Sequence, residues 1–446
     1  MQKTYLLDTN ILMQTEGKAL YGFEDNIVCI TTTSLEELDG LKKAPGEVGF
    51  EAREAIRTIF SIYENKGEKD VSLTAGINLP NQGIFKLIAT NPEEYNLPKG
   101  WSSDKPDNQI LGVAKMLSKK VNTNLVLITN DISMLIKAQV IGITTQQYKN
   151  DQVSADNKYT GRRQSIVETS LIDFLYKSGS LFELPEEYEE NEYVCLSDGN
   201  KSALAVHKRG TLKLLKDIKD PVFGIIPKNQ GQRFLMDALC LPPEEISLVI
   251  CNGVAGCGKT LLSVAAGLDK TIDKHNKQYD RIIITRSNTI CDEDMGYLPG
   301  TLEDKMMPLL APFMDNLLYL MNLDENDLEY ATERVHDLLS SKIIEICSLS
   351  YIRGRSLPHS YIIIDEAQNL TRLQAKTIVT RAGVGSKVIF LGDMNQIDNP
   401  KLDKKNNGLA YLSEKFRGSP LCAQIDFKIT ESVRSPLAIE AISRLE

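Results

Sequence analysis

The chain has 446 residues, a formal net charge of −9, and 42% hydrophobic and 25% charged residues. This length allows two or three domains with cores of their own, and the composition is that of an ordinary soluble globular protein. The acidic balance argues against a protein that holds nucleic acid by overall charge alone, although local basic patches remain compatible with such a partner.

The sequence favours a cytoplasmic location. No uninterrupted apolar stretch reaches the length of a membrane span, so we expect no membrane association. The first residues lead directly into a predicted strand that ends in an acid, Asp8, which is unlike a signal peptide. The eight cysteines are scattered without CxxC pairs, and this favours buried, reduced thiols.

Residues 1–150 alternate predicted strands with predicted helices. Strands are predicted around residues 3–7, 27–30, 125–129 and 143–145, and helices around residues 34–38, 51–56 and 107–117. This alternation predicts an α/β fold with a parallel sheet, whose functional groups gather at the carboxyl ends of the strands.

Carboxylates stand at these strand ends or at the helix starts beside them. They are Asp8, Glu37 or its neighbour Glu36, Asp131 and, at the start of a helix, Asp107. A cluster of carboxylates repels itself unless a divalent cation neutralises it, and oxygen ligands favour Mg²⁺ or Mn²⁺. Such an ion can activate water against a phosphodiester. Each acid taken alone is also explained as a helix cap or a solvated turn.

Four segments resemble the acidic motifs of PIN-domain ribonucleases, in the same order: residues 8–10, 35–39, 107–111 and 129–131. The resemblance implies a PIN-like parallel-sheet domain that cuts single-stranded RNA. The metal ligands that it implies are Asp8, Glu37, Asp107 and Asp131. It also implies that Thr9, Asn10 and Thr129 shape or hydrogen-bond these acids. In that family the acid directly before the leucine usually faces the metal, which favours Glu37 over Glu36.

Residues 151–220 are predicted to be a linker followed by a small β-rich module. Short apolar runs at residues 193–196, 203–206 and 212–215, separated by turns, predict a β-meander. The basic residues of this module are Lys201, His207, Lys208, Arg209, Lys213 and Lys216. Either they are solvated faces of a spacer, or the module guides RNA between the two larger domains.

An apolar run at residues 246–251 is followed by a glycine-rich loop and then by a helical pattern. The loop residues are Gly253, Val254, Ala255, Gly256, Cys257, Gly258, Lys259 and Thr260, and the helix continues from Leu261. This order is that of a phosphate-binding P-loop. The glycines let backbone N–H groups point at phosphate oxygens, Lys259 adds a positive charge, and the Thr260 hydroxyl can bind Mg²⁺. We therefore predict a site for ATP and Mg²⁺.

A second apolar run, residues 361–364, ends at two acids and predicts a Walker B element. In this interpretation Asp365 holds Mg²⁺ through water, and Glu366 orients or deprotonates the attacking water. Upstream of the P-loop, Gln232 is a candidate for reading adenine, as the Q-motif glutamine of helicases does. The alternative for Gln232 is a surface glutamine on a helix.

Three more residues are candidates for contact with the transferring phosphoryl group. Gln396 follows another predicted strand, residues 387–391, and can sense the γ-phosphate. Arg381 and Arg434 can stabilise charge there, either within one chain or from a neighbouring subunit. The alternative for each arginine is a surface or salt-bridging role.

Six segments resemble the PhoH family of ATPases, which itself resembles the core of superfamily 1 helicases. They are residues 253–260, 295–300, 365–369, 380–383, 392–398 and 433–435. The resemblance implies a RecA-like P-loop ATPase domain over residues 221–446. The order of the halves resembles that of bacterial PIN–PhoH fusions. Val254 and Cys257 stand where many members have Pro and Thr, but neither change removes a predicted phosphate contact.

One RecA-like core is half of what a superfamily 1 helicase uses, because those enzymes bind ATP between two lobes. The second wall must then come from another subunit, so we expect a homo-oligomeric ring, a hexamer, with Arg381 or Arg434 reaching across the interface. The predicted function is an ATP-dependent RNA helicase or translocase that feeds single-stranded or tailed RNA to a metal-dependent endoribonuclease. The alternatives are a ribonuclease regulated by an ATP-binding switch, and an RNA-binding ATPase with an inactive PIN domain. An antitoxin-like regulator of the PIN site is left open.

Overall fold

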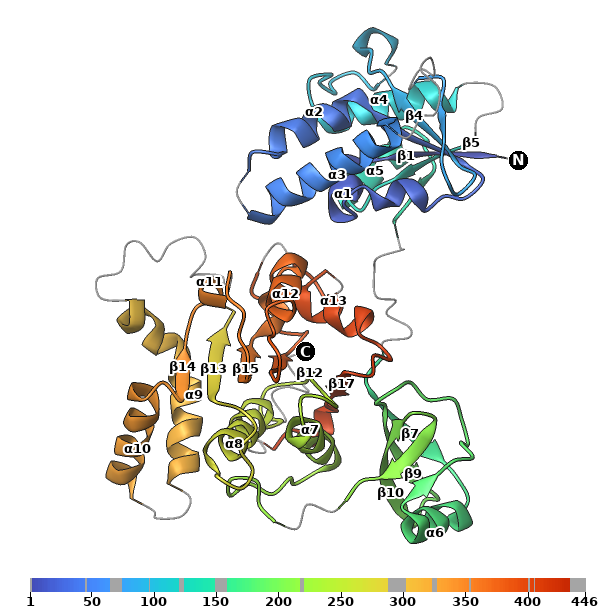
Figure 1. The fold of residues 1–446 in the computed structure, drawn as a ribbon. Helices are drawn as coiled ribbons and strands as arrows, with labels where there is room; N and C mark the ends of the chain where they lie inside the picture. The colour runs from blue at the N-terminus through green and yellow to red at the C-terminus, as the bar shows by residue number, and fades with distance from the viewer. Residues whose placement is uncertain are drawn as a thin grey trace. The chain divides into compact units, whose positions relative to one another are not determined.

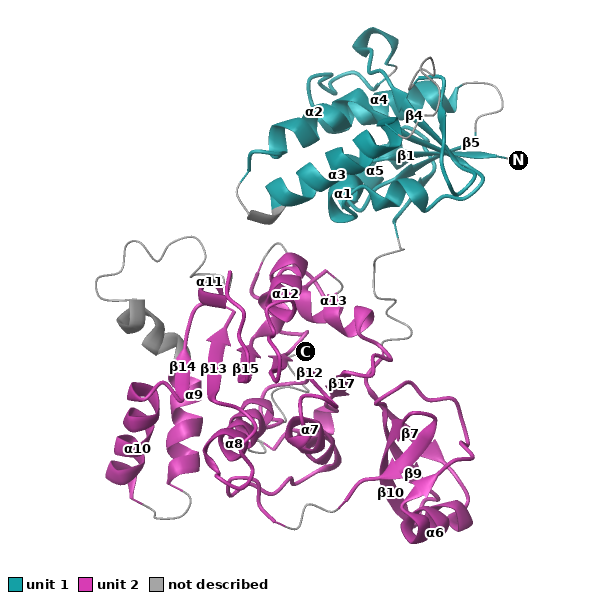
Figure 2. Ribbon diagram, in the orientation of Figure 1, with its two compact units in different colours: residues 1–154 teal, residues 155–446 magenta. Residues whose placement is uncertain are grey.

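A computed structural model describes residues 2–44, 46–64, 74–95, 97–119, 124–148, 159–216, 220–287, 302–322, 327–352, 354–399, 402–404 and 406–433 (Figure 1). The chain divides into two compact units, Met1–Ser154 and Ala155–Glu446 (Figure 2). The first unit ends close to the boundary predicted at residue 150. The β-rich module falls within the second unit, and the division into three domains stays a prediction.

The first unit contains a sheet with the strand order β3-β4-β2-β1-β5-β6. Its strands are β1 (Lys3–Leu7), β2 (Ile27–Thr31), β3 (Ile77–Asn78), β4 (Ile84–Ile88), β5 (Asn124–Ile128) and β6 (Thr145–Gln146). All neighbouring strands are parallel except β3 and β4. The helices are α1 (Thr9–Gln14), α2 (Thr32–Leu41), α3 (Gly46–Glu64), α4 (Pro106–Ser118) and α5 (Ile132–Val140), with 3₁₀ turns η1 (Lys18–Tyr21) and η2 (Pro92–Glu94). This is the α/β architecture that the alternation predicts.

Helices cover both faces of this sheet because its strands are apolar on both sides. Successive strand residues point to opposite faces, and the neighbours Leu6 and Leu7 are both fully buried. Leu6 packs in a core with Ile110 of α4 and Met134 of α5. Leu7 packs in a second core with Ala55 of α3. The strands are therefore buried on both faces, which is typical of a parallel sheet.

The second unit contains a six-stranded sheet with the order β14-β13-β15-β16-β12-β17, in which every neighbouring pair is parallel. Its strands are β12 (Leu248–Asn252), β13 (Arg281–Arg286), β14 (Ile344–Ile346), β15 (Ser360–Asp365), β16 (Lys387–Gly392) and β17 (Cys422–Asp426). Its helices are α7 (Gln230–Cys240), α8 (Lys259–Ile272), α9 (Leu302–Met321), α10 (Leu328–Ser340), α11 (Leu349–Ile352), α12 (Arg372–Val379) and α13 (Gly408–Lys415), with 3₁₀ turns η4 (Ala367–Asn369) and η5 (Ile429–Glu431).

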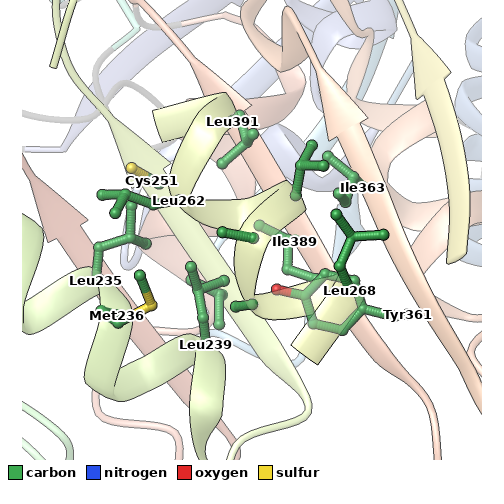
Figure 3. Close-up of a cluster of buried hydrophobic side chains, with 14 of the residues drawn as sticks. Leu235, Met236, Leu239, Cys251, Leu262, Leu268, Tyr361, Ile363, Ile389 and Leu391 are labelled. Atoms are coloured by element: carbon green, nitrogen blue, oxygen red, sulfur yellow. The ribbon is translucent and has the colours of Figure 1, made fainter. Parts of the chain in front are cut away.

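The main core of this unit holds α7 and α8 against one face of the sheet. Figure 3 shows Leu235, Met236 and Leu239 of α7 and Leu262 and Leu268 of α8 beside Ile363 of β15 and Ile389 and Leu391 of β16. In the sheet, β12 lies between β16 and β17, with Asn252 paired to both Gly392 and Asp426. The carboxyl ends of these three strands therefore meet at one edge.

The β-rich module has its own five-stranded sheet, with the order β7-β9-β10-β11-β8. Its elements are β7 (Arg162–Ile166), α6 (Thr169–Ser178), β8 (Ser180–Leu181), β9 (Tyr193–Ser197), β10 (Ser202–Lys208) and β11 (Thr211–Leu214). The predicted meander is confirmed as β9, β10 and β11, which pair antiparallel. The sequence analysis missed β7, which pairs parallel with β9, as well as β8 and α6. Among the described residues of the whole chain, no helix is both long and apolar enough to cross a bilayer.

Candidate active sites

The first site begins at Asp8, where β1 ends and α1 starts. Asp8 caps α1, and its Oδ1 accepts a hydrogen bond of 2.7 Å from the Thr9 N–H. Parallel pairing of Leu7 with Ile128 places Thr129 beside Asp8, and the Thr129 hydroxyl donates to Asp8 Oδ2 at 2.6 Å. Asp8 is 5% exposed. It is a buried carboxylate held in one orientation by both of its oxygens.

Glu37 approaches this carboxylate from α2, the helix that follows the neighbouring strand β2. The Thr9 hydroxyl donates to Glu37 Oε2 at 2.5 Å, so one short segment contacts both acids. Glu37 is partly buried, whereas Glu36 is exposed. The rotation of α2 thus agrees with the choice of Glu37 that the family resemblance favours.

The electrostatics show which acids interact. Burial raises the pKa of Asp8 to about 6, hydrogen bonds from Thr129 and Thr9 oppose the rise, and the negative charges of Asp107 and Glu37 add to it. Burial also raises the pKa of Glu37. The hydrogen bond from Thr9 lowers this pKa, and the negative charge of Asp107 raises it further. The negative charges of Asp107 and Glu37 thus act on Asp8, and the charge of Asp107 acts on Glu37.

Asp131, the fourth predicted ligand, has a different setting. It is exposed, and it caps α5 by accepting a hydrogen bond of 3.0 Å from the Met134 N–H. This is the helix-cap alternative that the sequence analysis left open, and it explains why an acid follows β5. From the same helix α5, the Lys137 ammonium lies 3.6 Å from the Asp107 carboxylate.

The donor atoms at this first site fit a hard cation in their chemistry. Asp8, Glu37 and Asp107 offer carboxylate oxygens, which Mg²⁺ and Mn²⁺ prefer, and a cation would relieve the mutual repulsion of the acids. The Asn10 side chain donates to the Thr129 hydroxyl at 3.4 Å, while its own Oδ1 is buried without a hydrogen-bond partner. As the side chains stand, no three Asp, Glu, His or Cys residues of the described segments are grouped to hold an ion together.

The second site is the glycine-rich loop between β12 and α8. Gly256 and Gly258 have φ angles of +88° and +86°, in the left-handed region that favours glycine. Gly253 is required for another reason, because a Cβ there would lie 2.6 Å from the Phe427 Cβ. The Lys259 ammonium lies over the loop and donates to the carbonyls of Gly253 and Val254 at 2.5 and 3.2 Å.

Gln232 contacts the loop from outside and is 6% exposed. Its Nε2 donates to the Cys257 carbonyl at 3.0 Å, and its Oε1 accepts from the Lys228 N–H at 2.8 Å. Gln232 is therefore a buried support of the P-loop. Its predicted contact with adenine stays a prediction.

The Walker B acids lie where β15 ends. Burial raises the pKa of Asp365 to about 6 and Glu366 adds to the rise, while the positive charges of Arg286 and Lys259 oppose it. Strand register explains one counter-charge, since Arg286 of β13 pairs with Asp365 of β15. Glu366 has a φ angle of +53°, and its Oε1 accepts from Arg286 Nη2 at 2.9 Å.

Gln368 is a functional candidate to which the sequence analysis assigned no role. It is fully buried, and its Nε2 donates to Glu366 Oε2 at 2.6 Å and to the Gln396 carbonyl at 2.8 Å. Its Oε1 accepts from the Asp393 N–H at 3.0 Å. Gln368 thus joins the Walker B acid to the loop after β16. Its position in the sequence, two residues after Glu366 in the same motif, could have indicated this role.

Comparison with known proteins identifies both units. A family profile described as "PhoH-like protein" matches residues 224–446, and a profile described as "PIN domain" matches residues 5–149. The chain belongs to the PhoH family. It is a fusion in which an N-terminal PIN domain, of the nuclease type, precedes a PhoH domain of the P-loop ATPase type.

Some relatives match this chain over nearly its whole length, and others match only part of it. "Protein PhoH2" of Bacillus subtilis (strain 168) is 36% identical over 98% of both chains. "Protein PhoH2" of Thermobispora bispora is 29% identical over 98% of this chain and 95% of its own. The shorter "PhoH-like protein" of Bacillus subtilis (strain 168) is 40% identical over 48% of this chain and 62% of its own.

The remaining predicted residues of the PhoH domain are less buried. Thr260 and Leu261 open α8 and are partly exposed, and the Gln396 side chain is exposed. Arg381 is also exposed, and its carbonyl accepts from the Leu357 N–H at 3.1 Å. The Leu357 segment leads into the amino end of β15, and the Arg381 segment leads into the amino end of β16. The P-loop, by contrast, follows the carboxyl end of β12. Arg381 therefore lies toward the opposite end of the sheet from the P-loop of its own chain. Arg434 and residues 295–300 lie outside the described residues.

Proposed function

We propose that the chain is an ATP-dependent RNA helicase or translocase coupled to a metal-dependent endoribonuclease for single-stranded RNA. The observation that supports this most directly is that each unit holds a buried carboxylate at the carboxyl end of a parallel strand. Asp8 lies among other acids, as hydrolysis with a divalent cation requires. Asp365 lies beside a P-loop lysine, as ATP hydrolysis requires.

In the PhoH domain each side chain has a separate task. Backbone N–H groups of the P-loop and Lys259 bind the phosphates, and Thr260 and Asp365 would hold the Mg²⁺ that accompanies ATP. The ion would supply positive charge to neutralise the phosphates. Glu366 orients the attacking water or accepts its proton. Its two oxygens are held by Arg286 and Gln368, so side chains of the protein itself set its position.

In the PIN domain, Asp8, Glu37 and Asp107 would hold Mg²⁺ or Mn²⁺. The ion supplies an activated water for attack on the phosphodiester. Thr9 and Thr129 keep the Glu37 and Asp8 carboxylates oriented through their hydroxyl groups. These hydrogen bonds also oppose the rise in the pKa of both acids, so the carboxylates ionise more readily.

Two substitutions separate the activities. Asp8→Asn should abolish cleavage of a fluorescent single-stranded RNA in Mg²⁺ or Mn²⁺ and leave ATP turnover intact. Lys259→Ala should abolish ATP turnover and leave cleavage of unstructured RNA intact, unless the two activities are strictly coupled. If neither substitution alters cleavage, the nuclease assignment is wrong. Unchanged ATP turnover in Lys259→Ala would overturn the ATPase assignment.

Coupling between the units requires its own experiment. A tailed RNA duplex should be unwound and its released strand cleaved only when ATP is present. The alternative is a ribonuclease gated by an ATP-binding switch, and it predicts ATP-dependent cleavage without strand displacement. A third alternative, an RNA-binding ATPase with an inactive PIN domain, predicts strand displacement without cleavage.

The proposal includes a hexameric ring, because one RecA-like domain provides one wall of an ATP site. Specific ATPase activity should fall when the protein is diluted below its assembly concentration, and adding Arg381→Ala subunits to wild type should lower it further. Activity that does not depend on concentration would contradict the ring. An antitoxin-like regulator would lower RNA cleavage without lowering ATP turnover.

A further inference from the structure

One buried carboxylate, that of Glu431, lies where the β-rich module meets the PhoH domain. Arg162 of β7 donates to both of its oxygens, with Nη1 and Nη2 at 2.6 and 2.9 Å. The two side chains are 6% and 9% exposed. The Gly231 and Lys428 N–H groups also donate to Glu431, at 2.9 and 2.8 Å. Burial raises the pKa of Glu431, but these hydrogen bonds and the Arg162 charge outweigh it and lower the pKa overall.

Both segments that meet at Glu431 continue to the P-loop. Directly after Glu431, the Ser432 hydroxyl donates to the Ala255 carbonyl at 3.2 Å, and the Val433 N–H donates to the Gly256 carbonyl at 3.0 Å. Directly after Gly231, Gln232 donates to the Cys257 carbonyl. Three successive P-loop carbonyls are therefore held from outside the loop. Holding these carbonyls outward leaves the neighbouring N–H groups free to point inward at an anion.

The β-rich module reaches this junction through β7 and the residues just before it. Arg162 Nη2 also donates to Gln230 Oε1 at 2.8 Å, and its guanidinium lies 5.3 Å from the centre of the Phe234 ring. The Thr160 carbonyl accepts from the Asp426 N–H at the end of β17 at 2.9 Å. Gly161 lies so close to β17 that a Cβ there would be 1.9 Å from the Gln424 carbonyl oxygen.

We propose that Arg162 is a positioning residue of the ATP site, which acts through Glu431 to hold the P-loop carbonyls of Ala255, Gly256 and Cys257. This inference rests on the proposed ATP binding. Because coupling between two sites is reciprocal, a bound nucleotide also tightens the contact of β7 with the PhoH domain. The β-rich module is then a part of the nucleotide site that senses its occupancy, and not a passive spacer.

Arg163, the next residue of β7, provides a matched control. Its guanidinium binds Glu192 at 3.0 Å and Glu186 at 3.3 Å, both inside the β-rich module. Arg162→Gln and Arg163→Gln therefore remove the same charge from adjacent positions of one strand. Only Arg162→Gln removes the hydrogen bonds to Glu431, the residue next to those that contact the P-loop.

The test uses the full chain, a fluorescent ATP analogue with Mg²⁺, and steady-state ATP turnover. Arg162→Gln and Glu431→Gln should each weaken analogue binding about tenfold, which corresponds to about 1.4 kcal/mol. The KM for ATP should rise with a smaller change in kcat, because the chemical groups stay in place. Arg162→Lys should recover part of the affinity, since it keeps the charge and loses the two-pronged geometry. The double substitution should cost less than the sum of the single ones.

A purely structural role of Arg162 gives a different result. Arg162→Gln and Arg163→Gln would then lower thermal stability to a similar degree and leave analogue affinity and KM at the wild-type values, and this would overturn the inference. Should Arg162→Gln fail to fold, Arg162→Lys and Ser432→Ala carry the test, and wild-type affinity in both would also overturn it. If the wild-type chain itself does not bind the analogue, the proposed ATP site and this inference fail together.

Discussion

Asp8 directly follows the buried strand β1 and Asp365 is the last residue of the buried strand β15, and burial raises the pKa of both to about 6. Their surroundings differ. Asp365 has two positive neighbours, Arg286 and Lys259, whose charges oppose the rise. Asp8 has hydrogen bonds from Thr129 and Thr9, while its charged neighbours Asp107 and Glu37 are negative and raise the pKa further.

This difference shows how each site balances its negative charge. The PhoH site carries part of the compensating charge in its own side chains, since Arg286 pairs with Glu366 and lowers the pKa of Asp365 together with Lys259. The PIN site gathers like charges, which are costly together unless a cation joins them. We therefore expect the PIN site to depend on a bound ion for stability as well as for activity, and the PhoH site to depend on its arginine and lysine.

The largest effect, on the stability of the PIN domain, is expected from neutralising Asp8. Since the pKa of Asp8 is raised from 3.8 to about 6, the folded chain binds more protons than the unfolded chain between these values, and its stability falls as pH rises through that window. Above pH 6 the ionised Asp8 lowers the free energy of unfolding by about 3 kcal/mol. Asp8→Asn should remove this cost and slow hydrogen exchange in the PIN domain at pH 7.5 but not at pH 4.

Metal supplies the control for this substitution. Mn²⁺ should slow hydrogen exchange in the wild-type PIN domain at pH 7.5 and have no such effect in Asp8→Asn. Exchange in peptides of the PhoH domain provides an internal reference, because two units need not unfold in one step. If wild type and Asp8→Asn exchange alike at both pH values, the buried charge of Asp8 does not destabilise the PIN domain.

A smaller effect is expected when the PhoH site loses its own counter-charge. Arg286→Gln leaves Glu366 without one of its two anchors and removes a charge that lowers the pKa of Asp365. Because a positioned base contributes about 10²- to 10⁴-fold, we expect ATP turnover to fall by about ten- to a hundredfold. Cleavage of unstructured RNA should not change.

Arg281, at the other end of the same strand, is the matched control for Arg286. Its guanidinium binds Glu345 Oε1 at 2.8 Å, away from the Walker B acids. Arg281→Gln should cost at most about 1 kcal/mol of stability, as partly exposed ion pairs do, and preserve ATP turnover. Equal losses of turnover in both variants would mean that the sheet, and not the counter-charge, is responsible.

The smallest effect is expected at Asp131. Asn is as good a helix cap as Asp, so Asp131→Asn should keep the α5 cap and change RNA cleavage by no more than about threefold. Asp131→Ala should cost about 1 kcal/mol of local stability, because the Met134 N–H loses its acceptor. Glu37→Gln, measured in the same assay, should abolish cleavage. A complete loss of cleavage in Asp131→Asn would instead support Asp131 as a metal ligand.

The sequence by itself determined the features that are contiguous along the chain. The P-loop, the Walker B acids and the alternation of strands and helices are local patterns, because a few successive residues set backbone conformation, strand ends and helix starts. The glycines at positions 256 and 258 are examples, since glycine adopts a left-handed φ without the steric cost that a side chain brings. The alternation predicted the parallel sheet of the first domain, and the resemblance to the PhoH family implied the fold of the second.

Only the tertiary structure decided which of these residues meet. The rotation of α2 partly buries Glu37 and exposes Glu36, and the start of α5 leaves Asp131 as an exposed cap. Parallel register sets Arg286 beside Asp365. The Arg162–Glu431 pair joins residues 269 positions apart. Contacts of this kind depend on how sheets and helices pack, and no periodicity or spacing within one segment encodes them.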